Sequence, residues 1–201
     1  MSGGESIREA YTVHGVTGYY RRAGESYRNP HEPEVRALIE EGVVRWGLPL
    51  GRVLDLACGS GEATLALREV GAGQVEGVDP YTGAAYRERT GQVAEAFGFE
   101  EIAKGRLEGR EYDLIVCSFA LHLVGPSWLP GLLYRLGTIS PHLLVLTPHQ
   151  RPGIDPAWGW VLREEIRRQR VRARIYDWQR SSEESEGEED GASEGVPAAA
   201  I

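Results

Sequence analysis

Short apolar runs alternate with longer segments of helical periodicity along most of this chain. The apolar runs predict strands at residues 52–56, 75–78, 112–118 and 143–147. Apolar residues at helical spacing predict helices at residues 33–46, 62–70, 82–90 and 121–137. Runs that are apolar throughout are typical of parallel strands covered on both faces. The alternation therefore predicts a single-domain α/β fold, a doubly wound, mostly parallel sheet with helices on both faces.

Two stretches have weaker patterns. Phe97 and Phe99 predict a short strand, and residues 100–103 predict a turn of helix. Residues 158–168 predict another helix. Residues 171–176 alternate apolar residues with arginine, which is typical of a strand with one solvated face.

Residues 53–61, with the sequence VLDLACGSG, form the segment around which the predicted sheet is organised. Three apolar residues surround Asp55, and then Gly59 and Gly61 allow a tight turn before a helix begins at Glu62. A strand, a glycine turn and a helix N-terminus leave backbone N–H groups free to bind an anionic part of a ligand. The pattern predicts a binding site at this turn.

Charge and composition divide the chain into three parts. The net charge is −8, but residues 181–201 hold seven acidic residues and no basic one. A segment of this Ser, Glu and Gly-rich composition cannot form a core, so we expect a disordered acidic tail over residues 179–201. Residues 1–32, rich in Gly, Arg and Tyr, predict an irregular N-terminal arm, which leaves residues 33–178 as the globular domain.

Composition also predicts where the protein is found. No apolar run reaches the length of about 18 residues that a membrane span needs, and the first residues lack the apolar core of a signal peptide. The two cysteines, Cys58 and Cys117, fit reduced thiols and not a disulfide framework. We therefore expect a soluble cytoplasmic protein, with the nucleus as the alternative, and no membrane association.

Three segments resemble the motifs of the class I (Rossmann-like) S-adenosylmethionine (SAM)-dependent methyltransferases. VLDLACGSG at residues 53–61 resembles the first motif, and VEGVDP, whose Asp79 follows Asp55 by 24 residues, resembles the second. YDLIVCSFALHLV at residues 112–124 resembles the motif of the fourth strand with its following loop. The resemblance covers about residues 52–147. It implies a seven-stranded sheet, SAM as the methyl donor and, as in most members, no metal.

The resemblance also implies which residues bind the parts of SAM. Asp55 would anchor the ammonium directly or through water, and Asp79 would accept the two ribose hydroxyls. Glycine-loop residues would lie against the methionine part, and residues after the third and fourth strands would contact the adenine and the sulfonium. The cofactor-binding candidates are Asp55, Ala57, Gly59, Gly61, Asp79, Pro80, Phe99, Glu100, Ser118 and Phe119.

Ala57 stands where the family often has a glycine, and its small side chain still allows a ligand to approach closely. A dinucleotide is the alternative ligand for a strand, a glycine turn and a helix. Its G-x-G-x-x-G fingerprint, however, would place a third glycine at Thr64, where there is none. The acid at the end of the second strand suits both ligands. The glycine pattern therefore favours SAM.

The candidates for a catalytic base lie near the expected site. They are His122, which follows the fourth-motif strand, and His31 and Tyr20 of the arm, which in this family commonly folds over the pocket. A base is optional, because the sulfonium is already activated and alignment supplies most of the catalysis of methyl transfer. A structural histidine is at least as good an interpretation of His122. The arm tyrosines are better explained by packing over the cofactor.

Six arginines between Arg163 and Arg174 form the main basic cluster of the chain. The cluster suits RNA phosphates or an acidic protein surface. Glu164 and Glu165 lie among the arginines, so the solvated faces of two elements, or an attraction for the acidic tail, are the alternatives.

The sequence predicts an enzyme that transfers a methyl group from SAM to a small molecule, a protein or an RNA. The alternative is a non-catalytic module of methyltransferase fold that acts through a protein or RNA partner.

Overall fold

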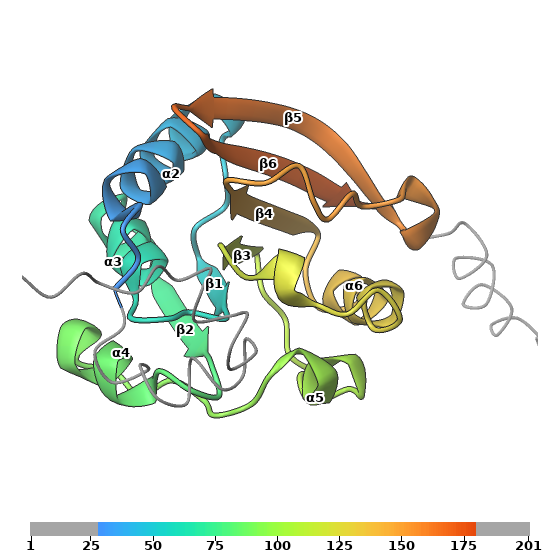
Figure 1. Cartoon of the computed structure of the whole chain (residues 1–201), viewed down its shortest axis with the longest axis horizontal. Helices are drawn as coiled ribbons and strands as arrows, with labels where there is room; N and C mark the ends of the chain where they lie inside the picture. Colours follow the sequence, from blue (N-terminus) through green and yellow to red (C-terminus); the bar gives the residue numbers. More distant parts are fainter. Residues whose placement is uncertain (1–27, 180–201) are drawn as a thin grey trace, which may run out of the picture.

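A six-stranded sheet forms the centre of the computed structural model, which describes residues 28–179 (Figure 1). The strands lie in the order β2-β1-β3-β4-β6-β5. Their bounds are Arg52–Leu56 (β1), Gln74–Val78 (β2), Leu114–Ser118 (β3), His142–Thr147 (β4), Trp160–Arg168 (β5) and Val171–Trp178 (β6). The first four strands are parallel to one another, whereas β6 is antiparallel to both β4 and β5. The predicted α/β fold with a mostly parallel sheet is confirmed, with an antiparallel hairpin at one edge.

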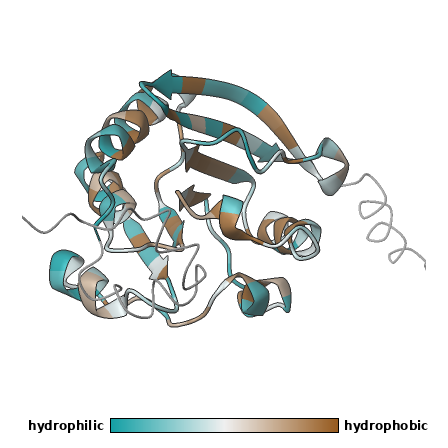
Figure 2. Cartoon of the chain, viewed as in Figure 1, coloured by the Kyte–Doolittle hydropathy of each residue, from teal (hydrophilic) through white to brown (hydrophobic). Residues whose placement is uncertain are grey.

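Helices cover both faces of this sheet. They are α2 (Glu32–Trp46), α3 (Glu62–Glu69), α4 (Gly83–Thr90), α5 (Phe99–Ala103) and α6 (Leu129–Gly137), with short 3-10 turns η2 (Leu121–Leu123) and η3 (Pro156–Trp158). Residues of α2 and α3 pack with one face of the strands, and residues of α5 and α6 pack with the other. Figure 2 shows β3, β4 and α6 as mostly hydrophobic and β5 as a mixture. None of the helices between residues 28 and 179 is long and apolar enough to cross a membrane.

The first helix shows how local signals place the elements around the sheet. α2 has a proline in its first turn and ends at Gly47, which adopts the left-handed conformation with φ of 60°. Leu38 and Ile39, which recur at the predicted helical spacing, are fully buried against the sheet. The helix therefore runs from the carboxyl edge of the sheet back to the start of β1.

Residues 158–168 correct one prediction, because they form η3 and strand β5 and not a helix. β5 pairs with β6 along most of its length, and Trp160 and Ile166 are buried. The charged residues that interrupt its apolar pattern are accommodated by ion pairs, since the Glu165 carboxylate accepts hydrogen bonds from Arg172 and Arg174 at 2.7 and 2.6 Å. Cross-strand pairing thus determines this element.

Two further predictions were wrong. Phe99 begins helix α5 and not a strand, because the Glu101 carboxylate accepts the Gly98 N–H at 3.0 Å and caps the helix. The predicted helix over residues 121–137 is divided into η2 and α6, with a proline in the first turn of α6. The seven-stranded sheet that the resemblance implied has six strands within the described residues.

Candidate active site

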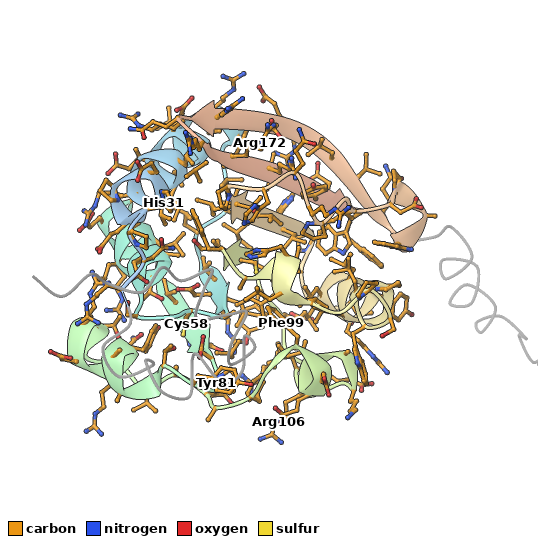
Figure 3. The ribbon with its side chains drawn as sticks, in the orientation of Figure 1. His31, Cys58, Tyr81, Phe99, Arg106 and Arg172 are labelled. Carbon is orange, nitrogen blue, oxygen red and sulfur yellow. The ribbon has the colours of Figure 1, made fainter. Side chains whose placement is uncertain are left out.

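A cavity of about 450 Å³ opens at the carboxyl ends of β1, β2 and β3. This volume lies within the range of roughly 300–1,000 Å³ that small-molecule sites occupy. Parallel strands end at the same edge of a sheet, and ligands of open α/β folds bind there. Figure 3 shows Cys58, Tyr81 and Phe99, which all line the cavity, around the ends of β1 and β2.

Most of the predicted cofactor-binding residues meet in this cavity. Those that line it are Ala57, Gly59, Asp79, Pro80, Phe99, Glu100, Ser118 and Phe119. Asp55 and Gly61 are not in its lining; Asp55 lies behind the glycine loop, and Gly61 begins helix α3. The structure therefore brings together, in one cavity, residues from four segments that lie apart in the sequence.

The loop between β1 and α3 is built from left-handed residues. Ala57, Gly59 and Gly61 have φ angles of 58°, 55° and 91°. A Cβ atom at Gly61 would lie 2.5 Å from Cγ2 of Thr90 in α4, so this position requires glycine for both its conformation and its space. As the N-cap, Gly61 also has no side chain to accept hydrogen bonds from the first turn of α3. The tight turn predicted from the glycines is confirmed.

Asp79 ties this loop to the end of β2. Its Oδ1 accepts the backbone N–H groups of Tyr81 and Thr82 at 2.8 and 3.0 Å, and its Oδ2 accepts that of Gly59 at 3.3 Å. The side chain is 8% exposed, so a nearly buried carboxylate remains at the cavity surface. Its predicted role, to accept the ribose hydroxyls, suits this position and stays a prediction.

Asp55 is fully buried behind the loop, on the side of α3. Its Oδ2 accepts the Thr64 hydroxyl at 2.6 Å, and its Oδ1 has no hydrogen-bond partner among residues 28–179. Burial raises the pKa of Asp55 to about 7, and the hydrogen bond from Thr64 only partly opposes this rise. The predicted contact with an ammonium group would thus come from behind the cavity surface.

Glu62 and Asn29 line the cavity and were not among the sequence candidates. Glu62 is 5% exposed; its Oε1 accepts the Asn29 backbone N–H at 2.9 Å and lies 3.1 Å from the Arg89 guanidinium. Its position directly after the glycine loop was the available signal. Asn29 is 33 residues away in sequence, so its contact had no local signal.

The lining residues give the cavity an acidic character. Among residues 28–179, four carboxylates, those of Glu62, Asp79, Glu100 and Glu101, face it together with one ammonium, that of Lys104. Oγ of Ser118 is buried beside the cavity without a hydrogen-bond partner in the described part of the chain. The site therefore suits a ligand with positive charge and with polar groups near the end of β3.

The three predicted catalytic residues have different positions. His122 lies in η2, outside the cavity lining, with its ring centroid 4.7 Å from that of His149 and its Nδ1 without a partner within residues 28–179. Burial, with a smaller effect of His149, lowers the pKa of His122 to about 4, so the imidazole is neutral at neutral pH. His31 stacks on the cavity residue Phe119 at 5.2 Å. Tyr20 lies outside the described residues.

The arginine cluster divides into two sets. Arg163 pairs with Asp177, and Arg172 and Arg174 pair with Glu165. The other three, at the turn between β5 and β6, are exposed and have no carboxylate partner among residues 28–179; they are Arg167, Arg168 and Arg170. The structure therefore shows intramolecular ion pairs for half of the cluster.

Comparison with known sequences identifies a family. Residues 30–184 match the family model described as a methyltransferase domain. An uncharacterized protein of Schizosaccharomyces pombe, C17A5.05c, is 34% identical, over 77% of this chain and 79% of that protein.

Solved structures show the same fold at low sequence identity. Magnesium protoporphyrin IX methyltransferase of Synechocystis, solved with bound SAM, has a TM-score of 0.55 and 19% identity, over 90% of this chain and all of that chain. The 1,6-didemethyltoxoflavin-N1-methyltransferase of Burkholderia thailandensis, solved with its substrate and S-adenosylhomocysteine, has a TM-score of 0.59 and 16% identity, over 90% and 94% of the two chains. This chain therefore belongs to the methyltransferase-domain family, with the fold of the class I SAM-dependent methyltransferases.

Proposed function

We propose that this protein transfers the methyl group of SAM to an acceptor that approaches the cavity beside Phe119. SAM is the cofactor that membership of this family implies. The observation that carries the proposal is the acidic cavity with Asp79 at the end of β2. SAM carries a sulfonium and an ammonium against one carboxylate, so its net charge complements this lining, whereas the phosphates of a dinucleotide do not.

The residues present fit each part of SAM. Asp79 would accept the ribose hydroxyls, and Pro80 and Phe99 supply apolar surface for the adenine ring. The ammonium would lie near Glu62, with the buried Asp55 behind the loop. The methionine carboxylate would meet the uncapped first turn of α3. The hydroxyl of Ser118, which has no hydrogen-bond partner among residues 28–179, provides a polar contact near the end of β3.

Alignment is the main contribution that this chain would make to the reaction. SAM supplies an electrophilic methyl group when it is bound, and an acceptor must approach in line with the bond that breaks. Phe119, held with a φ of 58° and stacked on His31, forms a rigid surface on which an acceptor is oriented. His122 stays only a predicted base, because a pKa of about 4 makes its imidazole a weak base at neutral pH and the residue lies outside the cavity lining.

Calorimetric titration of the full chain with SAM and S-adenosylhomocysteine tests the cofactor assignment. Both should bind, and Asp79→Asn should weaken them about 10- to 150-fold, which corresponds to a loss of about 1.5–3 kcal/mol for hydrogen bonds to a charged group. Asp113→Asn is the matched control, because Asp113 is an exposed carboxylate that accepts the Arg52 N–H away from the cavity. Absence of binding at millimolar concentrations of either compound would reject the proposal.

A transfer assay then separates the enzyme from a non-catalytic module. SAM with a labelled methyl group is incubated with the full chain and with cell extract divided into small molecules, protein and RNA. We expect label in one fraction, and its loss with Asp79→Asn. A protein that binds SAM but labels none of the fractions would instead support a module that acts through a partner.

A further inference from the structure

The turn between β5 and β6 carries several positive charges close together at the surface. The hairpin from Trp160 to Trp178 contains six arginines and three acidic residues. All three acids are bound elsewhere: Asp177 by Arg163, Glu165 by Arg172 and Arg174, and Glu164 by Arg45 and Trp46 of α2. Within the hairpin, no carboxylate therefore remains for the three arginines of the turn.

We name the exposed side chains of Arg167, Arg168 and Arg170 the basic turn. Like charges this close in sequence repel one another, and an anionic partner would relieve this repulsion. The acidic tail that follows the hairpin has the complementary composition. Six of its seven acids lie between Glu183 and Asp190, with no basic residue among them.

The chain is long enough for the two to meet. The end of β6 at Trp178 lies seven residues from Val171 at the turn, a distance of roughly 23 Å along a strand. Glu186, in the middle of the acidic run, follows Trp178 by eight residues, which span roughly 26–29 Å when extended. We propose that residues 183–190 of the acidic tail bind the basic turn of the same chain.

The position of the basic turn gives this contact a consequence for the site. The carboxyl end of β4 pairs with β6, Thr147 opposite Arg172, and the Phe119 N–H donates to the Leu146 carbonyl at 2.8 Å. Phe119 is thus two strand spacings, roughly 10 Å, from β6. Tail residues bound to the basic turn would lie beside the carboxyl edge from which an acceptor approaches. They would also compete there with any anionic acceptor.

Paramagnetic labelling of the full chain tests the contact without reference to activity. Ser185→Cys introduces a thiol in the tail, while Cys58 and Cys117 are only 4% and 0% exposed, so a nitroxide reagent should label position 185 in preference to them. At low salt, about 50 mM, the amide NMR signals of residues 166–172 should lose at least half of their intensity. They should recover at about 0.5 M salt, where the screening length falls to a few ångströms.

Charge variants separate a specific contact from general attraction. Combined Arg167→Gln, Arg168→Gln and Arg170→Gln substitutions should abolish the broadening. Arg36→Gln, Arg87→Gln and Arg135→Gln, which remove the same charge elsewhere, should preserve it. Unbroadened turn signals at low salt, or equal broadening in both triple variants, would overturn the proposal. In that case an RNA oligonucleotide that shifts the same signals would identify nucleic acid as the occupant of the turn.

Discussion

The two sides of the sheet hold their charged groups in different ways. On the β1–β2 side, the carboxylates of Asp79 and Asp55 are nearly or fully buried, and their partners are backbone N–H groups and a hydroxyl. On the β5–β6 side, carboxylates such as Glu165 lie near the surface and bind arginine side chains. The first arrangement fixes the backbone around a cavity. The second neutralises charged side chains on two neighbouring strands.

This difference predicts where substitutions have their effect. Changes on the β1–β2 side should alter the backbone conformation around the cavity or the dependence of stability on pH. Either change should also affect cofactor binding. Changes on the β5–β6 side should alter stability in a manner that depends on salt and pH, because the groups involved are partly solvated.

Gly61→Ala should have the largest effect. The alanine would combine a left-handed φ of 91° with a Cβ atom 2.5 Å from Thr90, which together cost about 3–4 kcal/mol of unfolding free energy. Binding of S-adenosylhomocysteine should be lost as well. Gly71→Ala is the control, since Gly71 has a φ of 94° but no atom of the described residues lies within 4 Å of a Cβ there, so only the backbone cost of about 1–2 kcal/mol applies. Equal losses from the two variants in urea unfolding would show that α4 moves aside freely.

Asp55→Asn should change how stability depends on pH. In the folded protein Asp55 holds its proton up to about pH 7, whereas in the unfolded chain it ionises near its ordinary pKa of 3.8. The unfolded state therefore binds fewer protons between these values, and the contribution of Asp55 to stability falls as the pH rises from 4 to 7.

Asparagine removes this titration, so the variant should gain about 1–3 kcal/mol relative to the natural protein at pH 8 and almost nothing at pH 4. Thermal unfolding at the two pH values measures the difference. Asp113→Asn, an exposed carboxylate, serves as the control. A variant less stable than the natural protein at pH 8 would mean that the buried carboxylate has a partner that residues 28–179 do not supply.

Glu165→Gln tests the opposite side of the sheet. Although burial tends to raise the pKa of Glu165, hydrogen bonds from Arg174 and Arg172 outweigh it and keep the pKa lowered. Its stabilising effect is therefore present at neutral pH and lost on acidification. The substitution leaves Arg174, only 9% exposed, without its carboxylate and should cost about 1–2 kcal/mol at pH 7. The loss should shrink at pH 3 in urea titrations, and cofactor affinity should stay within about twofold. A large loss of affinity would show that the β5–β6 side of the sheet influences the cavity.

His122→Phe should have a smaller effect with a pH dependence opposite to that of Asp55. Because burial lowers the pKa of His122 to about 4, the unfolded chain takes up the proton first as the pH falls from 6.5. The natural protein therefore loses about 1 kcal/mol of stability between pH 6.5 and 4 through this residue, and phenylalanine should remove that loss. His149→Phe removes only the smaller cause of the shift and should retain most of the slope. If the dependence of stability on pH is unchanged in His122→Phe, another titrating group causes it.

Sequence patterns predicted the β1–β2 side of the fold well because its signals are local. The apolar run over Val53 to Leu56 and the glycines that follow determine a strand and a turn within ten residues. Asp79 directly follows the predicted strand that ends at Val78, so the sequence also places it at a strand end. The face of β1 on which Asp55 lies cannot be predicted from the neighbouring residues, because both faces of this strand are covered. Its position behind the cavity surface depends on Thr64 in the next helix.

The parts that the sequence did not predict depend on contacts between separate elements. β5 has the composition of an amphipathic helix, and only its pairing with β6 makes it a strand. In the site, Glu62 is fixed by Asn29 and Arg89, which lie 33 and 27 residues away. No periodicity records such contacts, so a residue of the cavity lining went unnoticed although it directly follows the glycine loop.

Ala57→Gly has the smallest expected effect and tests the one departure from the family motif. Ala57 adopts a φ of 58°, where a Cβ costs about 1–2 kcal/mol, so glycine relieves strain in the folded state. Glycine also increases the conformational entropy of the unfolded chain, which costs about 0.4–1 kcal/mol. The net gain in unfolding free energy should be below about 1 kcal/mol, with cofactor affinity unchanged. Ala84→Gly, in the right-handed and exposed first turn of α4, should instead lose about 0.5–1 kcal/mol. Losses of equal size in both variants would mean that the Ala57 methyl group stabilises the loop by packing, which would distinguish this chain from members of the family that have glycine there.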